Sequence, residues 1–345
     1  MARLGRKTIA GAPLAADGSS PVMSRAEFDE ASYLAANIDI AEAVAAGVYV
    51  EGWVHYERHG RAEGRITRVI ETREHKILAA LDTSGLGLEV GPCHSPIAPK
   101  RSGYNVEILD YLDEDALKEH YAALRTEGID VDGIEHVDYV WKGEPIADVV
   151  GGASKYEWMI ASHVLEHIPD PIRFLQGVAE ILTPTGRFSM ALPDKRYCFD
   201  HFQPLSNTGA LLDAFTEERV KPTAGQVFQY FAHCAQLDGN IAWASGLGGE
   251  VEFRHDLTMG TNGWRGALDD ADFGGEIHCW RFTPESFRLL IAELGTMGLI
   301  DLKIVDSRPT NGSEFFVTLG HGRTIVTEEE RIALVRAAIT SDHER

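Results

Sequence analysis

Several shortages in the sequence exclude whole classes of protein. The four cysteines lie far apart and form no C-x-x-C pair, so we expect neither a disulfide framework nor a zinc knuckle. No apolar stretch approaches the roughly 18 residues of a membrane-spanning helix, and the N-terminus lacks the apolar core of a secretory signal. These absences predict a cytoplasmic protein with reduced thiols and no membrane span.

Basic residues are also scarce. The 345 residues include 32 Lys and Arg against 53 Asp and Glu, which gives a formal net charge of -21. We therefore expect no electrostatic binding to nucleic acid or to an anionic membrane. The 44% hydrophobic and 25% charged residues are typical of a globular protein, here long enough for one large α/β domain and a small accessory segment. A small neutral or carrier-linked substrate fits this charge best.

Residues 86–110 form the stretch around which the chain is organised. An apolar run over residues 86–90 stops at Gly91, as a buried strand does before a sharp turn, and a second run over 106–109 stops at Asp110. Asp110 follows Gly91 by 19 residues. That is close to the interval of about 20 at which a dinucleotide-type fold places a carboxylate against ribose hydroxyls. The stretch therefore predicts half of a nucleotide site.

The turn lacks the G-x-G-x-x-G pattern of dehydrogenases, because it has only Gly91, which Pro92 and Cys93 follow. An NAD-dependent oxidoreductase is therefore disfavoured. Glu89, two residues before Gly91, completes a pattern that resembles the first motif of class I S-adenosylmethionine-dependent methyltransferases. The resemblance implies that Glu89 lies near the methionine end of the cofactor and that Asp110 holds its ribose. It also implies further cofactor contacts from Gly91, Pro92, Cys93 and Tyr111.

A second segment strengthens this resemblance. Residues 156–175 and 179–187 resemble the fourth strand, the following helix and the next turn of the same family. The residues agree, since 159–162 form an apolar run and Asp170 can cap a helix that has Pro171 at its first position. The resemblance implies that Ser162 and His163 lie beside the cofactor, whereas we expect His167 to be structural.

The two motifs, in this order, imply a Rossmann-like α/β fold with a seven-stranded sheet of order 3-2-1-4-5-7-6, the last strand antiparallel. Apolar runs place the strands at residues 86–90, 106–109, 137–141, 159–162, 187–192, 300–305 and 315–319. Helices are expected at 66–82, at 114–126, after Asp170, at 283–298 and at 327–339. Trp141, after the third strand, is a candidate to stack on adenine or, equally, to pack against the protein.

The predicted domains are a loosely ordered tail over residues 1–24, a helical module over 25–65, the methyltransferase domain over 66–325 and a C-terminal helix over 326–345. The domain contains an insertion at about 202–280, after strand five, with helices near 210–220 and 225–237. We favour a lid or substrate wall for this insertion over a dimer interface.

The helical module begins with Ser24 and Glu27, a capping-box pair, and a helix is expected from there to Gly47, followed by a short helix around Trp53. Residues 33–40 and 55–65 resemble a small module attached to some bacterial glycan-processing enzymes. This resemblance implies association rather than catalysis. His55 and His59, four residues apart, have the spacing of metal ligands, but we favour helix packing for them.

Methyl transfer to a hydroxyl needs an aligned nucleophile and a base, and histidine suits the base because its pKa lies near neutrality. The candidates, in order of preference, are His201, His278 and His163. Residues Asp194, Lys195, Arg196 and Tyr197 follow the fifth strand and are the expected substrate contacts, because such sheets bind ligands beyond their carboxyl ends. Asp194 or Asp200 is placed to orient the base or, with a histidine, to ligate a divalent ion, and surface ion pairing is an equal alternative. A divalent metal is thus allowed, but no metal site is assigned.

The function predicted is S-adenosylmethionine-dependent O-methylation of a saccharide or glycan intermediate. Two alternatives remain, a non-catalytic S-adenosylmethionine-binding assembly protein of a glycan pathway and a methyltransferase for another small molecule. The expected partners are the small-molecule or carrier-linked saccharide and, through residues 25–65, a second copy of the chain or a glycan enzyme.

Overall fold

A computed structural model describes residues 25, 28–63, 65, 72–124, 129–270 and 277–343. The chain divides into two compact units, an N-terminal unit within residues 6–73 and a C-terminal unit within residues 74–345. The predicted tail over residues 1–24, with its Ser24 cap, lies outside the described residues, as does the part of the predicted helix over 66–71.

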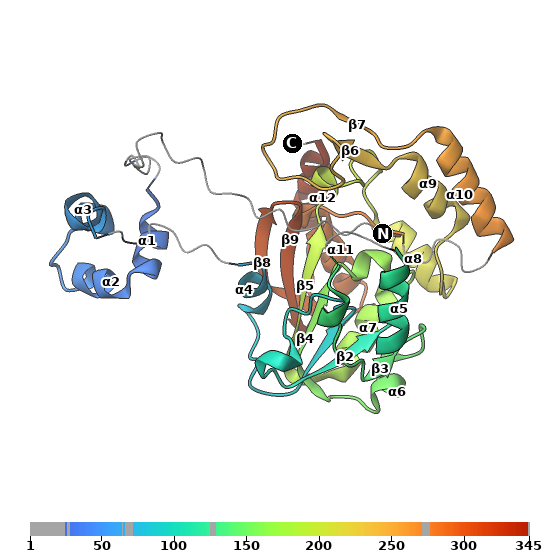
Figure 1. The fold of residues 1–345 in the computed structure, drawn as a ribbon, viewed down its shortest axis with the longest axis horizontal. Coiled ribbons are helices and arrows are strands. Elements are labelled where there is room, and N and C mark those ends of the chain that lie inside the picture. The colour runs from blue at the N-terminus through green and yellow to red at the C-terminus, as the bar shows by residue number, and fades with distance from the viewer. Residues whose placement is uncertain are drawn as a thin grey trace. The chain divides into compact units, whose positions relative to one another are not determined.

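The C-terminal unit is built on a seven-stranded sheet of order β3-β2-β1-β4-β5-β9-β8 (Figure 1). Strands β1 to β5 run parallel to one another, and β9 runs antiparallel to both β5 and β8. This confirms the predicted order, with β8 and β9 as the sixth and seventh strands. The strands are β1 (Gly87–Val90), β2 (Val106–Asp110), β3 (Tyr139–Val140), β4 (Tyr156–Ser162), β5 (Leu182–Pro193), β8 (Leu302–Asn311) and β9 (Glu314–His321).

Both faces of the sheet are covered, because the central strands are apolar on both sides. Neighbouring residues of β4 point to opposite faces. Met159 joins the larger cluster with helices α6 (Ile146–Val150), α7 (Pro171–Ile181) and α11 (Pro284–Thr296), whereas Trp158 joins Ile77 of helix α4 (Arg73–Leu78) in a second cluster. Helix α5 (Glu114–Leu124) buries Leu117 against Ile108 of β2. The chain's last described helix is α12 (Glu328–His343).

The helix starts follow the predicted capping chemistry. Asp170 accepts a hydrogen bond from the Arg173 amide at 3.0 Å, and Pro171 opens α7. Thr283 forms a reciprocal capping box with Ser286 at the start of α11. These local signals place both helices within a few residues of where the sequence predicts them.

The insertion after β5 contains more structure than predicted. It holds α8 (Thr208–Thr216), α9 (Ala224–Ala232), a two-stranded sheet of β6 (Ala235–Leu237) with β7 (Val251–Phe253), and α10 (Leu257–Asp269). The predicted extension of the second helix to residue 237 is wrong, because Ala235 and Leu237 pair with β7 instead. Helices α9 and α10 lie side by side (Figure 1). Residues 271–276 of the insertion lie outside the described part.

The N-terminal unit consists of α1 (Glu30–Ala36), α2 (Ile38–Ala45), α3 (Gly52–His55) and a π-helical turn (Tyr56–Gly60). The single helix expected up to Gly47 is wrong, because buried Asn37 interrupts it with φ -132° and ψ 78°. His55 is buried, and its Nδ1 lies 2.8 Å from the Tyr33 hydroxyl. The unit therefore uses His55 in its aromatic core.

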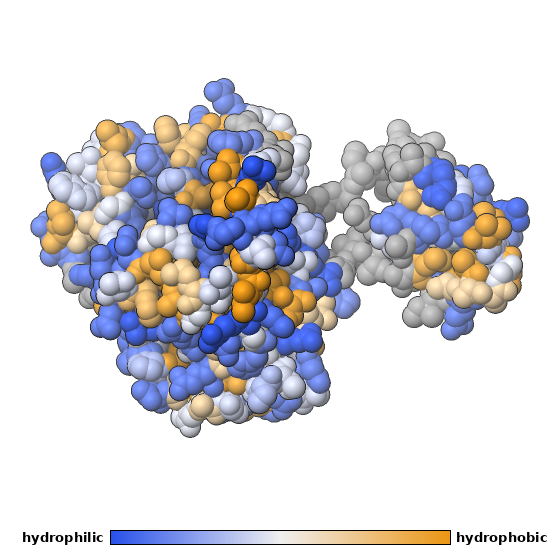
Figure 2. All heavy atoms as spheres, turned by 180° about the vertical axis from the view of Figure 1, so that it is seen from behind, coloured by the Kyte–Doolittle hydropathy of each residue, from blue (hydrophilic) through white to orange (hydrophobic). Residues whose placement is uncertain are grey.

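Short 3₁₀ turns complete the described structure at Lys100–Ser102, Val131–Gly133, Leu165–His167 and Lys195–Tyr197. Hydrophilic side chains cover most of the face seen in Figure 2, with hydrophobic ones in separate patches. Among the described helices, none combines the length and apolar character needed to cross a membrane.

Candidate active site

The loop after β1 is held by the carboxylate of Glu89. Its Oε1 accepts a hydrogen bond from the Ile97 amide at 2.7 Å, and its Oε2 accepts one from the Ala98 amide at 3.0 Å. Gly91 and Cys93 both adopt left-handed backbone, at φ 60° and 52°. Through these two amides the buried Glu89 side chain holds the loop that leaves the carboxyl end of β1.

Asp110 ends β2 at the same edge of the sheet, since parallel strands present their carboxyl ends together. Its side chain is buried, and Oδ1 accepts a hydrogen bond from the Tyr111 amide at 2.8 Å. Tyr111 is 38% exposed. Trp141, just beyond β3, donates its indole N–H to the Glu144 carbonyl at 2.7 Å and packs 5.7 Å from the Phe174 ring. Of its two predicted roles, the structure shows packing for Trp141.

The end of β4 carries His163 in left-handed backbone at φ 55°, next to the partly buried Ser162. A non-glycine residue in this region is strained, and such strain clusters at functional sites. His163 Nε2 lies 2.8 Å from Glu314 Oε2, and Nδ1 lies 3.4 Å from Glu166 Oε1. Burial lowers the pKa of His163, but the two carboxylates outweigh it and raise the pKa above the ordinary 6.5.

Glu166 is the carboxylate on which this cluster converges. Burial raises its pKa, yet His163, His167 and His278 outweigh that effect and hold the pKa at about 2. His278 is itself buried, and its Nδ1 lies 2.5 Å from Asp200 Oδ2. Two of the three predicted base candidates, His163 and His278, therefore meet at Glu166.

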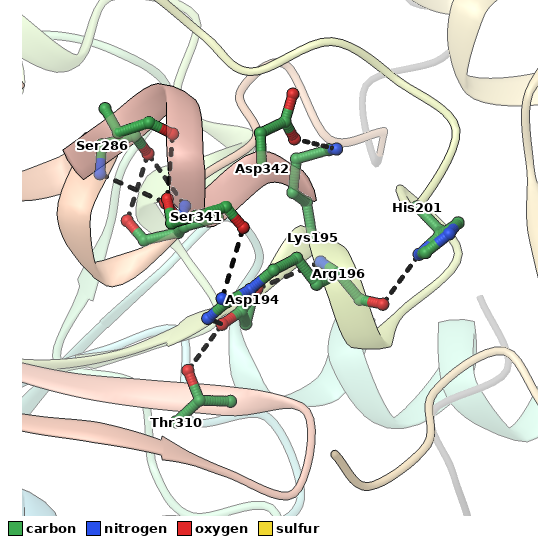
Figure 3. Close-up of polar contacts among 10 residues, drawn as sticks. Asp194, Lys195, Arg196, His201, Ser286, Thr310, Ser341 and Asp342 are labelled. Atoms are coloured by element: carbon green, nitrogen blue, oxygen red, sulfur yellow. Dashed lines mark hydrogen bonds and ion pairs between the residues drawn. The ribbon is translucent and has the colours of Figure 1, made fainter. Parts of the chain in front are cut away.

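His201, the first-ranked base candidate, belongs to a different group of side chains. Its Nδ1 lies 2.8 Å from the Arg196 carbonyl, so this nitrogen carries the proton (Figure 3). The ring centroids of Phe202 and Trp243 lie 5.2 Å and 5.9 Å from its own. Phe202 in turn lies 4.7 Å from Phe253, and both phenylalanines are exposed.

The predicted substrate contacts after β5 are partly engaged inside the protein (Figure 3). Asp194 is fully buried and accepts hydrogen bonds from Arg196 Nε at 2.9 Å and Nη2 at 2.6 Å, and from the Thr310 hydroxyl at 2.5 Å. Lys195 is 4% exposed and pairs with Asp342 of α12 at 2.5 Å. These contacts tie the end of β5 to α12 and to β8, and Tyr197 is buried as well.

A family model described as a methyltransferase domain matches residues 61–296, more than half of the chain. The chain belongs to this methyltransferase family. Its methyl donor is S-adenosylmethionine. No curated protein matches the chain.

Solved structures give distant likenesses. The CcbJ methyltransferase from Streptomyces caelestis is similar over 73% of this chain and 97% of its own, with 14% identity and a TM-score of 0.36. A putative Zn-dependent alcohol dehydrogenase from Rhodobacter sphaeroides is similar over 72% and 88%, with 11% identity and a TM-score of 0.36. A SAM-dependent methyltransferase from Aquifex aeolicus is similar over 36% and 66%, with 14% identity and a TM-score of 0.26. Likenesses this low carry no argument about function.

The carboxyl edge of the methyltransferase sheet fits the donor's nucleoside. Asp110 offers a buried carboxylate, the kind of acceptor that ribose hydroxyls need. A side chain at Gly91 would place its Cβ 3.1 Å from Val164 Cγ2 and in a left-handed backbone, so only glycine leaves this turn unstrained.

The methyltransferase also has a pocket of about 370 Å³ beside α11 and the β8–β9 hairpin. Arg196 and Tyr197 line it together with two further arginines, Arg288 and Arg308. Arg288 donates to the Ser307 hydroxyl at 3.1 Å. Glu285 lines the pocket as well, and Asp194 and Asp306 pair with Arg196 and Arg308.

Sequence reasoning missed the carboxylates that organise the methyltransferase's histidines. Glu166 lies three residues after His163, and a charged residue within the apolar run at 164–168 was a usable signal for a buried functional group. Glu314 gave no such signal, because it reaches His163 only through the pairing of β9 with β5. His167, expected to be structural, lies at the same cluster.

Proposed function

We propose that this methyltransferase methylates a hydroxyl group of a saccharide or glycan intermediate, with His201 as the general base. The observation that carries the proposal is the setting of His201. Its Nδ1 proton is donated to a backbone carbonyl, so its Nε2 is the basic nitrogen, and the exposed Phe202 ring and the buried Trp243 ring flank it.

The cofactor contacts are part of the same proposal. Asp110 accepts hydrogen bonds from the ribose hydroxyls, while the backbone of Gly91, Pro92 and Cys93 approaches the donor closely, as do Tyr111 and Ser162. Glu89 acts through the loop that it holds. S-adenosylmethionine supplies an electrophilic methyl group when bound. The chain's own residues align the acceptor and remove its proton.

A saccharide acceptor agrees with the surroundings of His201. The apolar C–H faces of a sugar ring pack well on flat aromatic side chains, and Phe202 and Phe253 are 38% and 55% exposed. The chain's net charge of -21 disfavours polyanionic acceptors. The resemblance of residues 33–65 to a module of glycan-processing enzymes adds a second, independent support.

The test is methyl transfer from radiolabelled S-adenosylmethionine to a panel of neutral sugars, nucleotide sugars and lipid-linked glycans. We expect a labelled product with at least one saccharide, and a kcat reduced by roughly 100-fold or more in His201→Gln with little change in KM. Unchanged turnover of His201→Gln at saturating substrate would remove it as the base.

Two other outcomes point elsewhere. Binding of S-adenosylmethionine without transfer to any acceptor favours the non-catalytic assembly protein. Transfer only to non-saccharide hydroxyls favours a methyltransferase for another small molecule.

A further inference from the structure

Glu166 carries a fully buried carboxylate just beyond β4. Its exposed fraction is 0%, and within the part of the chain that the structure describes neither of its oxygens has a hydrogen-bond partner. Buried carboxylates without partners are rare, because the desolvation of an ion costs several kcal/mol unless an opposite charge and hydrogen bonds compensate it. His163 Nδ1, 3.4 Å from Oε1, is one source of positive charge, and a bound cation close to Glu166 is the other way to compensate this carboxylate.

Besides His163, two imidazoles face this carboxylate, both through the same atom, Nε2. His278 Nε2 lies 3.9 Å from Glu166 Oε1, and His167 Nε2 lies 4.0 Å from it. Donor atoms from these three residues all lie within 4.8 Å of one another. Distances near 4 Å are too long for hydrogen bonds, but they surround a point that one ion can occupy.

The opposite nitrogens of both rings are already fixed by acceptors. His278 Nδ1 lies 2.5 Å from Asp200 Oδ2, and His167 Nδ1 lies 3.0 Å from the Ile277 carbonyl. Since carboxylate and carbonyl oxygens accept, each Nδ1 carries the proton and each Nε2 is left as a lone-pair donor. Histidine ligands of metals are held in this way, by a carboxylate or a backbone carbonyl behind the ring.

We propose that Glu166, His167 and His278 bind one divalent transition-metal ion, for which Zn²⁺ is the best fit. Two imidazoles and a carboxylate are a ligand set that Zn²⁺ takes, with a fourth position left for water or a substrate oxygen. With ligands about 2.0–2.2 Å from the ion, the three donors close on one another by roughly an ångström. The His167 side chain is 21% exposed and gives the ion a route from solvent.

The ion has a place in the fold as well. It joins the segment after β4 to His278, where the insertion returns to the core, and Asp200 brings in the segment after β5. Three separate parts of the chain are therefore held at one point. This proposal is independent of the acceptor and of the identity of the base.

The experiment is metal binding by the full chain, purified without a polyhistidine tag and dialysed against a chelator. We expect calorimetric titration with Zn²⁺ to give one ion per chain, and Co²⁺ to give the visible absorption bands of a four- or five-coordinate site. Glu166→Gln and His278→Gln should each weaken Zn²⁺ binding by more than 100-fold. Asp200→Asn, which removes only the acceptor behind His278, should weaken it by about 10- to 100-fold.

The matched control is His201→Gln, because His201 is also partly buried and also donates Nδ1–H to a backbone carbonyl. Its Zn²⁺ affinity should equal that of the unaltered chain. Circular dichroism and denaturant unfolding show whether each variant is folded. If Glu166→Gln does not fold, Asp200→Asn is the variant that tests the proposal. The proposal is overturned if the unaltered chain does not bind one Zn²⁺ ion, or if folded Glu166→Gln and Asp200→Asn each bind Zn²⁺ as tightly as the unaltered chain. A protonated histidine is then the counterion of Glu166.

Discussion

Asp110 is the single residue on which cofactor affinity is expected to depend most. A hydrogen bond to a charged group contributes about 1.5–3 kcal/mol. Asp110→Asn should therefore weaken S-adenosylmethionine binding by roughly 10- to 100-fold in calorimetric titration. Asp115→Asn, an exposed aspartate in the first turn of α5, is the control and should bind normally. Equal affinity in both variants would place the ribose elsewhere.

Glu107, on the same strand, sets a pH dependence of stability. Burial raises its pKa, but hydrogen bonds from Lys155 and Tyr156 outweigh that effect and hold the pKa below the ordinary 4.5. The ionised Glu107 carboxylate therefore stabilises the folded protein at neutral pH, and this contribution is lost as the pH falls through and below about 4.5. Lys155 has a raised pKa, so its share is lost only as the pH rises above 10.5.

Glu107→Gln should lower the free energy of unfolding at pH 7 by about 1.5–3 kcal/mol. Urea titrations at a series of pH values measure this difference, which should shrink towards zero in acid. The exposed Glu119→Gln is the control and should show less than about 0.5 kcal/mol at any pH. A difference for Glu107→Gln that grew in acid would contradict the assignment.

At the scale of elements, the close contact of α9 with α10 depends on glycine. A Cβ at Gly260 would lie 2.5 Å from the Cβ of Ala232 and 3.1 Å from its Cα. Gly260→Val should force the helices apart at a cost of about 1–3 kcal/mol. Hydrogen exchange should then speed up in α9, α10 and the β6–β7 pair, while the seven-stranded sheet keeps its protection.

Gly225→Ala is the matched change in the first turn of α9. Its Cβ would meet only the Thr223 hydroxyl at 3.8 Å, and alanine favours the helix, so exchange should be unchanged or slower. Uniform loss of protection across the sheet in Gly260→Val would show that the insertion and the core unfold as one unit.

At the scale of the whole molecule, the two compact units predict separable functions. The carboxyl-edge residues proposed for the cofactor all lie in the C-terminal unit, from Glu89 to His163. Deleting residues 1–71 should therefore leave a folded protein that binds S-adenosylmethionine with unchanged affinity by calorimetry. Loss of cooperative unfolding, or binding weakened more than about tenfold, would show that the N-terminal unit supports the site.

The approximate positions of the strands followed from local signals repeated along the chain, whereas their order was implied by the resemblance of two motifs to class I methyltransferases and is confirmed by the sheet. Apolar runs ending at Gly91, Asp110 and Ser162 define parallel strands whose carboxyl ends meet at one edge. The caps at Asp170 and Thr283 are equally local, since each uses a backbone amide three residues ahead. Short-range hydrogen bonds and apolar periodicity depend on residues close together in the chain, so sequence patterns can predict them.

Other features depended on contacts that no local pattern encodes. Asn37 interrupts the first helix, and residues 235–237 form a strand because β7, many residues later, offers its edge. Lys195 pairs with Asp342 of α12, 147 residues later, whereas the pairing of Asp194 with Arg196 is the ion-pair alternative that the sequence left open.

The sequence by itself determined the approximate strand positions and the helix caps, and its resemblance to the methyltransferase family implied the strand order. Only the tertiary structure decided which charges face one another. Glu166, His167 and His278 come from two segments more than a hundred residues apart, and Glu314 reaches His163 across a strand pair. Such a cluster exists only when burial removes water from between the groups, because charges that stay solvated do not hold each other in place.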